Sequence, residues 1–212
     1  MKHVISGVEK FQKEIYPHKQ TKFKKLASGQ NPEVLFITCS DSRIDPNLIT
    51  QSDPGDLFIC RNAGNIVPPH SNNTGGMTAS IEFAVAALGV TDIIICGHTD
   101  CGAMKGALDT SALDELPHVK EWLGHARIAT EVVKERCGCL GVEQLEALTE
   151  ENVVQQMQHL RTHPAVAAKL ATKQVRLHGW MYDIEKGDVY CYNAETSAFE
   201  PMAELYAQQS QE

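Results

Sequence analysis

Two short segments, residues 39–43 and 98–101, contain the side chains of this chain that are best suited to bind a metal ion. Together they offer two thiols and one imidazole, whereas a closed structural zinc site needs four protein ligands. Catalytic zinc sites commonly use three protein ligands and leave the fourth position to water or substrate. The spacing of His98 and Cys101 allows two side chains on one turn to reach the same ion. The pattern therefore predicts an open zinc site, bound by Cys39, His98 and Cys101, of the kind found in hydrolases and hydratases.

The first segment also contains a carboxylate, Asp41, and a guanidinium, Arg43. Asp41 could act as the fourth ligand, which would close the site. It could instead bind Arg43 in a bidentate pair, which would leave room for water and keep the carboxylate ionised and aimed. The residues alone leave both arrangements open.

The remaining thiols and imidazoles are weaker candidates for a site. Cys60 and Cys96 fall within apolar runs and are expected in the core, as most cysteines are. Cys137 and Cys139 form a CxC pair with no histidine spaced to complete a site. His70 lies in a polar loop and is expected to be a surface imidazole.

An apolar run precedes each of the two segments that contain the candidate metal ligands. Residues 34–38 form an unbroken apolar run that ends at Cys39, and residues 91–96 lead to His98. Such runs are typical of parallel strands that are buried on both faces. Ligands of a parallel α/β sheet bind outside the carboxyl ends of its strands. Segments far apart in sequence can therefore meet around one ion.

The rest of the chain alternates between strand and helix patterns. Helices are expected over residues 77–88, 117–136, 142–162 and 164–173, a strand over 56–61, and a hairpin from 175–182 and 188–192. This alternation predicts an α/β fold with a central, mostly parallel sheet of four strands plus an added C-terminal strand or hairpin, flanked by helices. We expect one domain, 1–212. It would comprise an N-terminal helical arm over 1–30 with a break at Pro17, a catalytic core over 31–205 and a polar tail over 206–212.

Composition excludes several classes of protein. The chain of 212 residues carries a net charge of −8, so nucleic acid is not an expected partner, because phosphate binding needs a clustered basic surface. No stretch approaches the ~20 apolar residues that cross a bilayer, so no membrane partner is expected. Seven scattered cysteines do not fit a secreted disulfide scaffold, which predicts a cytoplasmic protein.

Several motifs of this sequence resemble those of a known family. The pattern Cys39-Ser-Asp-Ser-Arg43 with His98-x-x-Cys101-Gly102 is similar to the signature of the β-class carbonic anhydrases. The resemblance continues through residues 54–58, 61–67, 80–83, 97–103 and 177–184. It implies one zinc ion per subunit, bound by the two cysteines and the histidine. It further implies reversible hydration of carbon dioxide to bicarbonate and a proton, by zinc-bound hydroxide that the Asp41–Arg43 pair orients.

The resemblance also implies a set of substrate-binding residues. Gln30 stands nine residues before Cys39, where members of the plant-like subgroup of the family have a glutamine that donates a hydrogen bond to the substrate oxygen. Phe58, Ala63 and Phe83 match positions of the apolar pocket, and Gly102 matches a backbone contact. Phe83 replaces a usual tyrosine and Ala63 is smaller than the usual residue, and either change could alter the fit of the pocket.

One position separates the two subgroups of the family. Members with a regulatory bicarbonate site have a tryptophan where this chain has Phe36. The resemblance therefore implies the plant-like type, in a bacterial member, with no bicarbonate switch. In the family, N-terminal helices wrap a partner subunit, which implies a homodimer or a higher even-numbered homo-oligomer.

Two alternatives to carbon dioxide hydration are open at this stage. Relatives of the family hydrolyse carbon disulfide or carbonyl sulfide at the same kind of zinc site. A non-enzymatic zinc or redox sensor, which would release metal when Cys39 and Cys101 are oxidised, is the alternative from another class. A sensor would not require Asp41, Arg43 or Gln30.

Overall fold

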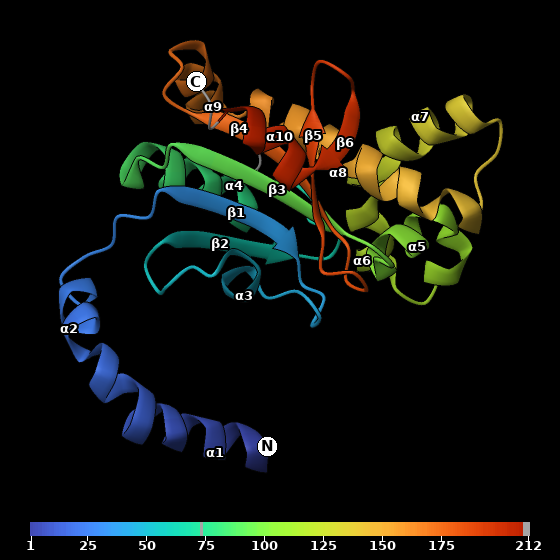
Figure 1. Cartoon of the computed structure of the whole chain (residues 1–212). Coiled ribbons are helices and arrows are strands. Elements are labelled where there is room, and N and C mark those ends of the chain that lie inside the picture. The colour runs from blue at the N-terminus through green and yellow to red at the C-terminus, as the bar shows by residue number, and fades with distance from the viewer. Residues whose placement is uncertain (73, 210–212) are drawn as a thin grey trace. The chain divides into compact units, whose positions relative to one another are not determined.

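The structure, a computed structural model, describes residues 1–72 and 74–209 (Figure 1). It divides the chain into two compact units, Met1–Asn31 and Pro32–Glu212.

The first unit is helical. Helices α1, Lys2–Lys10, and α2, Tyr16–Leu26, are joined by a π-helical turn over Phe11–Ile15. Pro17 lies in the first turn of α2, directly after the π-helical turn, so the two α-helical pieces meet near this proline, as expected from the sequence. A proline ring clashes with the carbonyl four residues earlier, and the wider turn directly upstream accommodates it.

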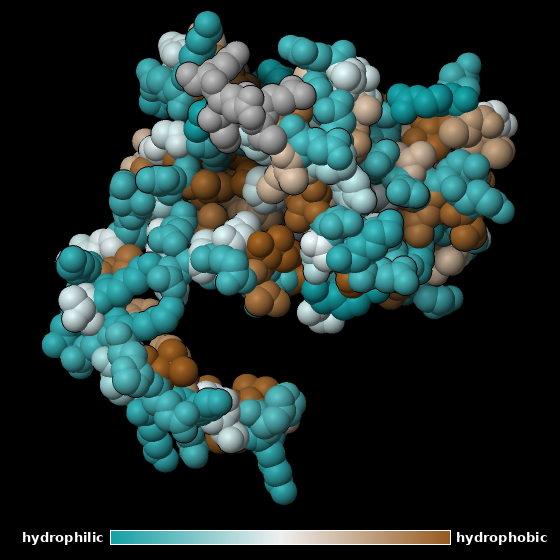
Figure 2. Space-filling model, in the orientation of Figure 1, coloured by the Kyte–Doolittle hydropathy of each residue, from teal (hydrophilic) through white to brown (hydrophobic). Residues whose placement is uncertain are grey.

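The first unit exposes apolar side chains. Those on and directly after α1 are 41–54% exposed: Val4, Ile5, Val8, Phe11 and Ile15. Figure 2 shows hydrophobic atoms among polar ones on the visible face of this helix. No described residue of α1 or α2 is buried. The rings of Phe11, Tyr16 and Phe23 pack on one another, with centroids 5.5–6.1 Å apart.

The second unit is built on one sheet. Its described strands are β1 Val34–Cys39, β2 Leu57–Asn62, β3 Asp92–His98, β4 Arg176–Tyr182, β5 Val189–Asn193 and β6 Ala198–Pro201. Their order is β2-β1-β3-β4-β5-β6 (Figure 1). The first four are parallel, whereas β5 and β6 are antiparallel. The predicted fold class is confirmed. Strand β6 was not predicted, because four residues are too few to show an alternating pattern.

Helices flank the sheet. They are α3 Pro46–Thr50, α4 Gly76–Glu82, α5 Gly102–Leu108, α6 Pro117–Leu123, α7 Arg127–Cys137, α8 Leu145–Thr162, α9 Pro164–Ala171 and α10 Met202–Gln209. A π-helical segment, Phe83–Leu88, continues α4, and a 3₁₀ turn, Gly124–Ala126, divides the helix expected over 117–136. Residues 206–209, expected as part of the polar tail, form the end of α10, and residues 210–212 lie outside the described residues.

The main core lies on one face of the sheet, against α4, α8 and α9. Leu35 and Ile37 of β1 face this core, whereas Phe36 between them faces the other side. There its ring packs against Trp180, with centroids 5.8 Å apart. Successive strand residues point to opposite faces, so an unbroken apolar run serves both.

Two glycines let α8 approach the sheet closely. A Cβ on Gly97 of β3 would lie 2.7 Å from Val153 Cγ2, and a Cβ on Gly179 of β4 would lie 2.7 Å from Met157 Sδ. Val153 and Met157 both belong to α8. A larger residue at either glycine would force these side chains to shift. Among the residues that the structure describes, no helix is long and apolar enough to cross a membrane.

Candidate metal centre and active site

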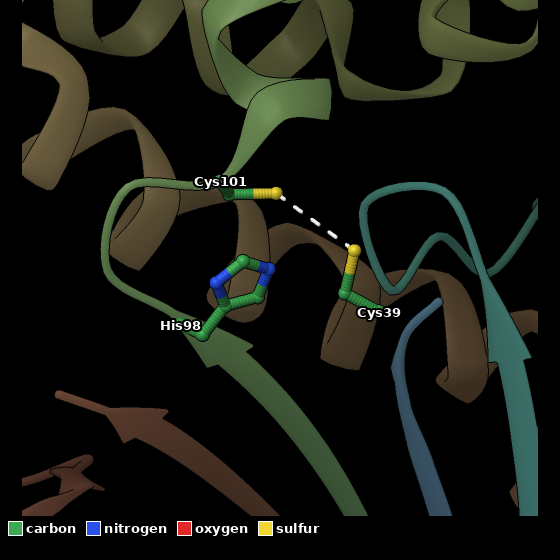
Figure 3. Close-up of side chains that lie close together, drawn as sticks. All are labelled: Cys39, His98 and Cys101. Atoms are coloured by element: carbon green, nitrogen blue, oxygen red, sulfur yellow. Dashed lines mark hydrogen bonds between the residues drawn. The ribbon is translucent and has the colours of Figure 1, made fainter. Parts of the chain in front are cut away.

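The side chains of Cys39, His98 and Cys101 lie together at the carboxyl ends of two neighbouring strands (Figure 3). Cys39 is the last residue of β1, His98 is the last residue of β3, and the two strands pair in parallel. Cys101 directly precedes α5. All three are buried, and one ligand atom from each lies within 4.8 Å of the others. The structure thus brings together the three residues that the sequence singled out as metal ligands.

The two sulfurs form a close pair of thiols. Their Sγ atoms are 4.0 Å apart, too far for a disulfide, and one thiol hydrogen bonds to the other. The hydrogen bond with Cys101 lowers the pKa of Cys39 well below its usual value, against the opposing effect of burial. The hydrogen bond with Cys39 raises the pKa of Cys101 far above its usual range, and burial adds to that rise. Two thiolates this close together would repel each other, and a bound cation would offset that repulsion.

The ring of His98 is held in one tautomer. Its Nδ1 lies 2.8 Å from the carbonyl oxygen of Thr99, and a carbonyl can only accept, so Nδ1 carries the proton. Nε2 then has a lone pair, and this buried atom has no hydrogen-bond partner among the described residues. An unpartnered polar atom in a buried place calls for an explanation.

A zinc ion fits these three donors. Two sulfurs bound to one tetrahedral zinc ion at ~2.3 Å would lie about 3.8 Å apart, and the observed separation is 4.0 Å. A histidine that ligates a metal usually donates its other ring N–H to a carbonyl or carboxylate, as His98 does to Thr99. Three such ligands leave the fourth position for water or substrate.

Asp41 and Arg43 form a bidentate pair beside this group. Nε of Arg43 donates to Oδ1 of Asp41 at 2.9 Å, and Nη2 donates to Oδ2 at 2.8 Å. The backbone N–H of Arg43 donates to Oδ1 at 3.0 Å. These hydrogen bonds hold the pKa of Asp41 far below its usual value, so the carboxylate is ionised. Of the two arrangements left open by the sequence, the structure contains the one in which Asp41 binds Arg43.

Arg43 is itself held by Asp100, which the sequence analysis did not single out. Nη1 of Arg43 donates to Oδ2 of Asp100 at 3.0 Å, and Nη2 donates to the backbone carbonyl of Asp100 at 3.2 Å. Lys105 pairs with the other carboxylate oxygen of Asp100. Asp100 has a φ of 58° in the turn that joins His98 to Cys101. One feature of the sequence could have pointed to Asp100: it is a carboxylate that lies between two candidate metal ligands, His98 and Cys101.

Gly64 is a further residue of the site that sequence reasoning missed. Its backbone N–H donates to Sγ of Cys39 at 3.4 Å. Gly64 has a φ of +81°, and an added Cβ would lie 3.0 Å from Met104 Cε and 3.1 Å from Ala103 Cβ. Both neighbours belong to α5, directly after Cys101. Backbone conformation and close packing therefore both require glycine here.

Comparison with known proteins decides the family. Residues 34–189 match the family model described as "Carbonic anhydrase". A carbonic anhydrase from Pseudomonas aeruginosa is 46% identical over 204 residues, which cover 96% of this chain and 93% of that protein. The protein named carbonic anhydrase 1 from Escherichia coli O157:H7 is also 46% identical, over 96% of this chain and 93% of that protein. This chain belongs to the carbonic anhydrase family.

Solved structures place this carbonic anhydrase in the β class. The β-carbonic anhydrase CcaA superposes with a TM-score of 0.91 and 43% identity, over 95% of this chain and 98% of that chain. One of two tetrameric β-carbonic anhydrases from Sordaria macrospora superposes with a TM-score of 0.81 and 31% identity, over 91% of this chain and 96% of that chain. The family resemblance seen in the sequence is thereby confirmed.

Two predicted pocket residues lie away from the metal centre of their own chain. Phe58 pairs with Leu35, whereas Asn62 pairs with Cys39. Phe58 therefore lies four residues, or about 13 Å, from the carboxyl end of β2. Its ring packs against Phe83, with centroids 6.1 Å apart, and Phe83 is 48% exposed. The strand register thus places Phe58, with the Phe83 ring packed against it, away from the metal-ligand candidates of its own chain. The role of both rings toward substrate stays a prediction.

The other predicted substrate-binding residues lie in three different places. Ala63 directly precedes Gly64, and its carbonyl accepts a hydrogen bond from Trp122 Nε1 at 2.9 Å. Gly102 is the first residue of α5 and directly follows a metal-ligand candidate. Gln30 is exposed and belongs to the first unit, in the segment after α2. Their roles toward substrate stay predictions.

The remaining thiols and His70 differ in environment. Cys60 and Cys96 are buried in β2 and β3, as expected of core residues, and burial raises the pKa of Cys96 to about 12. Cys137 and Cys139 are exposed at the end of α7. His70 is exposed, and its ring packs against another histidine.

Proposed function

We propose that this carbonic anhydrase hydrates carbon dioxide reversibly with one zinc ion per subunit, bound by Cys39, His98 and Cys101. The observation that carries the proposal is the unpartnered Nε2 of His98, which is buried beside two thiols whose sulfurs lie 4.0 Å apart. Zinc bound there would supply the Lewis acidity that lets water ionise near neutral pH. Family membership supplies the substrate.

Asp41 would orient the water that attacks carbon dioxide. Both carboxylate oxygens already accept from Arg43, and a carboxylate oxygen has a further lone pair for a water hydrogen. Acceptance of that hydrogen would turn the water oxygen toward the substrate carbon. Arg43 keeps the carboxylate ionised and in place, and Asp100 holds the guanidinium.

The substrate contacts form a further part of the proposal. The amide of Gln30 would donate to the substrate oxygen that gains negative charge, and loss of such a donor typically costs about 3 kcal/mol. Ala63 and Gly102 stand next to the metal centre and would leave room for a small apolar gas. Phe58 and Phe83 would line the pocket of a neighbouring subunit, because their own metal centre is about 13 Å away along β2.

An even-numbered homo-oligomer is the proposed assembly. The Sordaria macrospora relatives are described as tetrameric, and none of the residues of α1, including its apolar ones, is buried in the single chain. Light scattering should give at least twice the mass of one chain. Val8→Asp should lower that mass, whereas Lys13→Asp, at a 76% exposed side chain, should not. A monomeric wild-type protein would refute this assembly.

The plant-like subgroup without a bicarbonate switch is supported by two features. Phe36 is fully buried against Trp180, where the other subgroup has its regulatory tryptophan. Asp41 is bound to Arg43 rather than free to reach a metal ion. A cytoplasmic location stays a prediction from the cysteine pattern.

Zinc analysis combined with a stopped-flow carbon dioxide assay tests the proposed function. We expect about one zinc ion per chain, with activity lost to a chelator and restored by zinc. His98→Ala should lose both the zinc and the activity, whereas His118→Ala, at an exposed imidazole in α6, should keep both. A zinc-loaded chain that releases hydrogen sulfide from carbonyl sulfide but does not hydrate carbon dioxide would refute the proposed reaction.

A further inference from the structure

Four hydrogen bonds run in one direction from the loop before Pro68, through helix α8, to the sulfur of Cys39. Val67 N–H donates to Oε1 of Gln156 at 2.8 Å, and Nε2 of Gln156 donates to Oδ1 of Asn152 at 2.9 Å. Nδ2 of Asn152 then donates to the carbonyl of Gly64 at 3.0 Å, and Gly64 N–H donates to Cys39 Sγ at 3.4 Å. Both amide side chains are 0% exposed.

The order of donors and acceptors fixes how each amide is oriented. Gln156 must present its oxygen to the N–H of Val67, which directs its nitrogen to Asn152. Asn152 must then accept with its oxygen and donate with its nitrogen. His159 Nδ1 lies 2.7 Å from the carbonyl of Val67 and 3.1 Å from Oε1 of Gln156, both acceptors, so it donates at the same place. Reversal of either amide would place two donors or two acceptors against each other.

Other contacts hold both the loop that contains Gly64 and Val67 and helix α8 in place. The side chain of Asn62 closes the loop, because it accepts from Ile66 N–H at 2.7 Å and donates to the Ile66 carbonyl at 2.8 Å. Helix α8 rests directly on the sheet at Gly97 and Gly179. The peptide groups on either side of Gly64 are therefore held by fixed partners.

We propose that Asn152 and Gln156 are positioning residues that hold the backbone at Gly64 so that its N–H points at the Cys39 sulfur, and that they thereby set the affinity of the site for zinc. An N–H that points at a thiolate draws electron density from the sulfur and fixes its direction. Outer-shell partners of this kind typically change metal affinity 10–100-fold when they are mutated. The inference rests on the metal binding in the proposed function.

The asparagine offers a substitution that keeps the size of the side chain. Asn152→Asp replaces the donor that faces the Gly64 carbonyl with an acceptor. We expect zinc affinity, measured by chelator competition, to fall about 10-fold. In cobalt-substituted protein, the thiolate-to-cobalt charge-transfer band should shift. Gln156→Met, which removes the orienting partner and keeps Asn152, should change both readouts in the same direction by a smaller amount.

Leu160→Ala is the matched control, because Leu160 is an equally buried α8 residue whose side chain makes no hydrogen bonds. It should lower stability and leave the cobalt band and the zinc affinity unchanged. Variants of Asn152 and Gln156 with wild-type zinc affinity and an unshifted band would overturn the inference, as would an equal shift in the control. If Asn152→Asp does not fold, Gln156→Met decides the question.

These readouts do not depend on turnover, so the two proposals can fail separately. A wild-type chain that binds zinc and cobalt but does not hydrate carbon dioxide refutes the proposed reaction and leaves this test intact. An active wild-type enzyme with unchanged variants refutes only the positioning role. A wild-type chain that binds neither metal overturns both.

Discussion

Oδ2 of Asp41 lies 3.9 Å from Nε2 of His98, the buried nitrogen that has no hydrogen-bond partner among the described residues. The same carboxylate accepts three N–H groups from Arg43. It is therefore turned toward the guanidinium while it stays next to the ligand group. A carboxylate held in this way is better placed to accept a hydrogen bond from a water at the fourth ligand position than to bind the metal itself.

Asp41→Asn should separate these two roles. The amide keeps the shape of the carboxylate but loses its charge, so we expect zinc content to stay near the wild-type value. Carbon dioxide hydration should fall by at least about 100-fold, the usual size of a lost acid–base group. Asp114→Asn, at a surface pair with Lys120, is the control and should keep full activity. Near-normal turnover in Asp41→Asn would show that the pair with Arg43 is structural.

The rate of hydration should rise through mildly alkaline pH. Two thiolates donate more charge to a metal than two imidazoles, so water should ionise above the pH of about 7 that is typical of a three-histidine site. Arg43 holds the pKa of Asp41 far below its usual value, so Asp41 stays ionised throughout and adds no second transition. Stopped-flow rates from about pH 6.5 to about pH 9 check this. A flat profile would count against ionisation of water as the controlling step.

Gly64→Ala should destabilise the protein more than another glycine substitution with the same backbone strain. Gly187 has a φ of +76° with nothing within 4 Å of an added Cβ, so Gly187→Ala measures the strain alone. Gly64→Ala adds crowding against Ala103 and Met104, which should cost about 1–2 kcal/mol more in the free energy of unfolding. It should also weaken zinc binding, because the N–H that faces Cys39 is displaced. Equal losses in the two variants would contradict this account.

Acid should weaken the fold partly through Asp92. Its carboxylate accepts from Nε and Nη2 of Arg176, both at 2.8 Å, and lies 2.8 Å from Nε2 of His178. Burial opposes ionisation, but these partners outweigh it and lower the pKa of Asp92 to about 2. A lowered pKa gives stability that is present at neutral pH and is lost as pH falls from about 4 toward about 2.

Asp92→Asn measures that contribution. Arg176 is largely exposed, so solvent screening reduces the expected loss to about 1 kcal/mol at neutral pH. Near pH 2 the variant and the wild type should differ little. Urea unfolding at both pH values, with a chelator present so that metal release does not contribute, provides the measurement. An equal difference at the two pH values would rule out this titration.

The clustering of the three candidate metal ligands could be predicted because the residues carry strong local signals. Cys39 and His98 each end an apolar run, and parallel strands bring their carboxyl ends to one edge of the sheet. Asp41 and Arg43 stand close to the first ligand in sequence. None of these inferences needed a backbone angle or a pairing register.

The parts that were missed depend on tertiary structure. The φ values of Gly64 and Asp100 are set by the turns that hold them, and sequence spacing does not report them. Asn152 and Gln156 look like residues of a solvent-facing helix surface, and only the unpaired backbone groups of the nearby loop explain why they are buried. The place of Phe58 follows from strand register, which an apolar run does not specify.

Cys39 ends β1 whereas Cys101 lies 62 residues later, just before α5, and no local stretch of polypeptide can bring their sulfurs together. In the denatured chain these donors lie far apart, so zinc binding, if it occurs as proposed, would be coupled to folding. Each tenfold rise in free zinc above the dissociation constant should then add about 1.4 kcal/mol to the free energy of unfolding. In a cell that lacks zinc, the enzyme would then be both inactive and less stable toward unfolding.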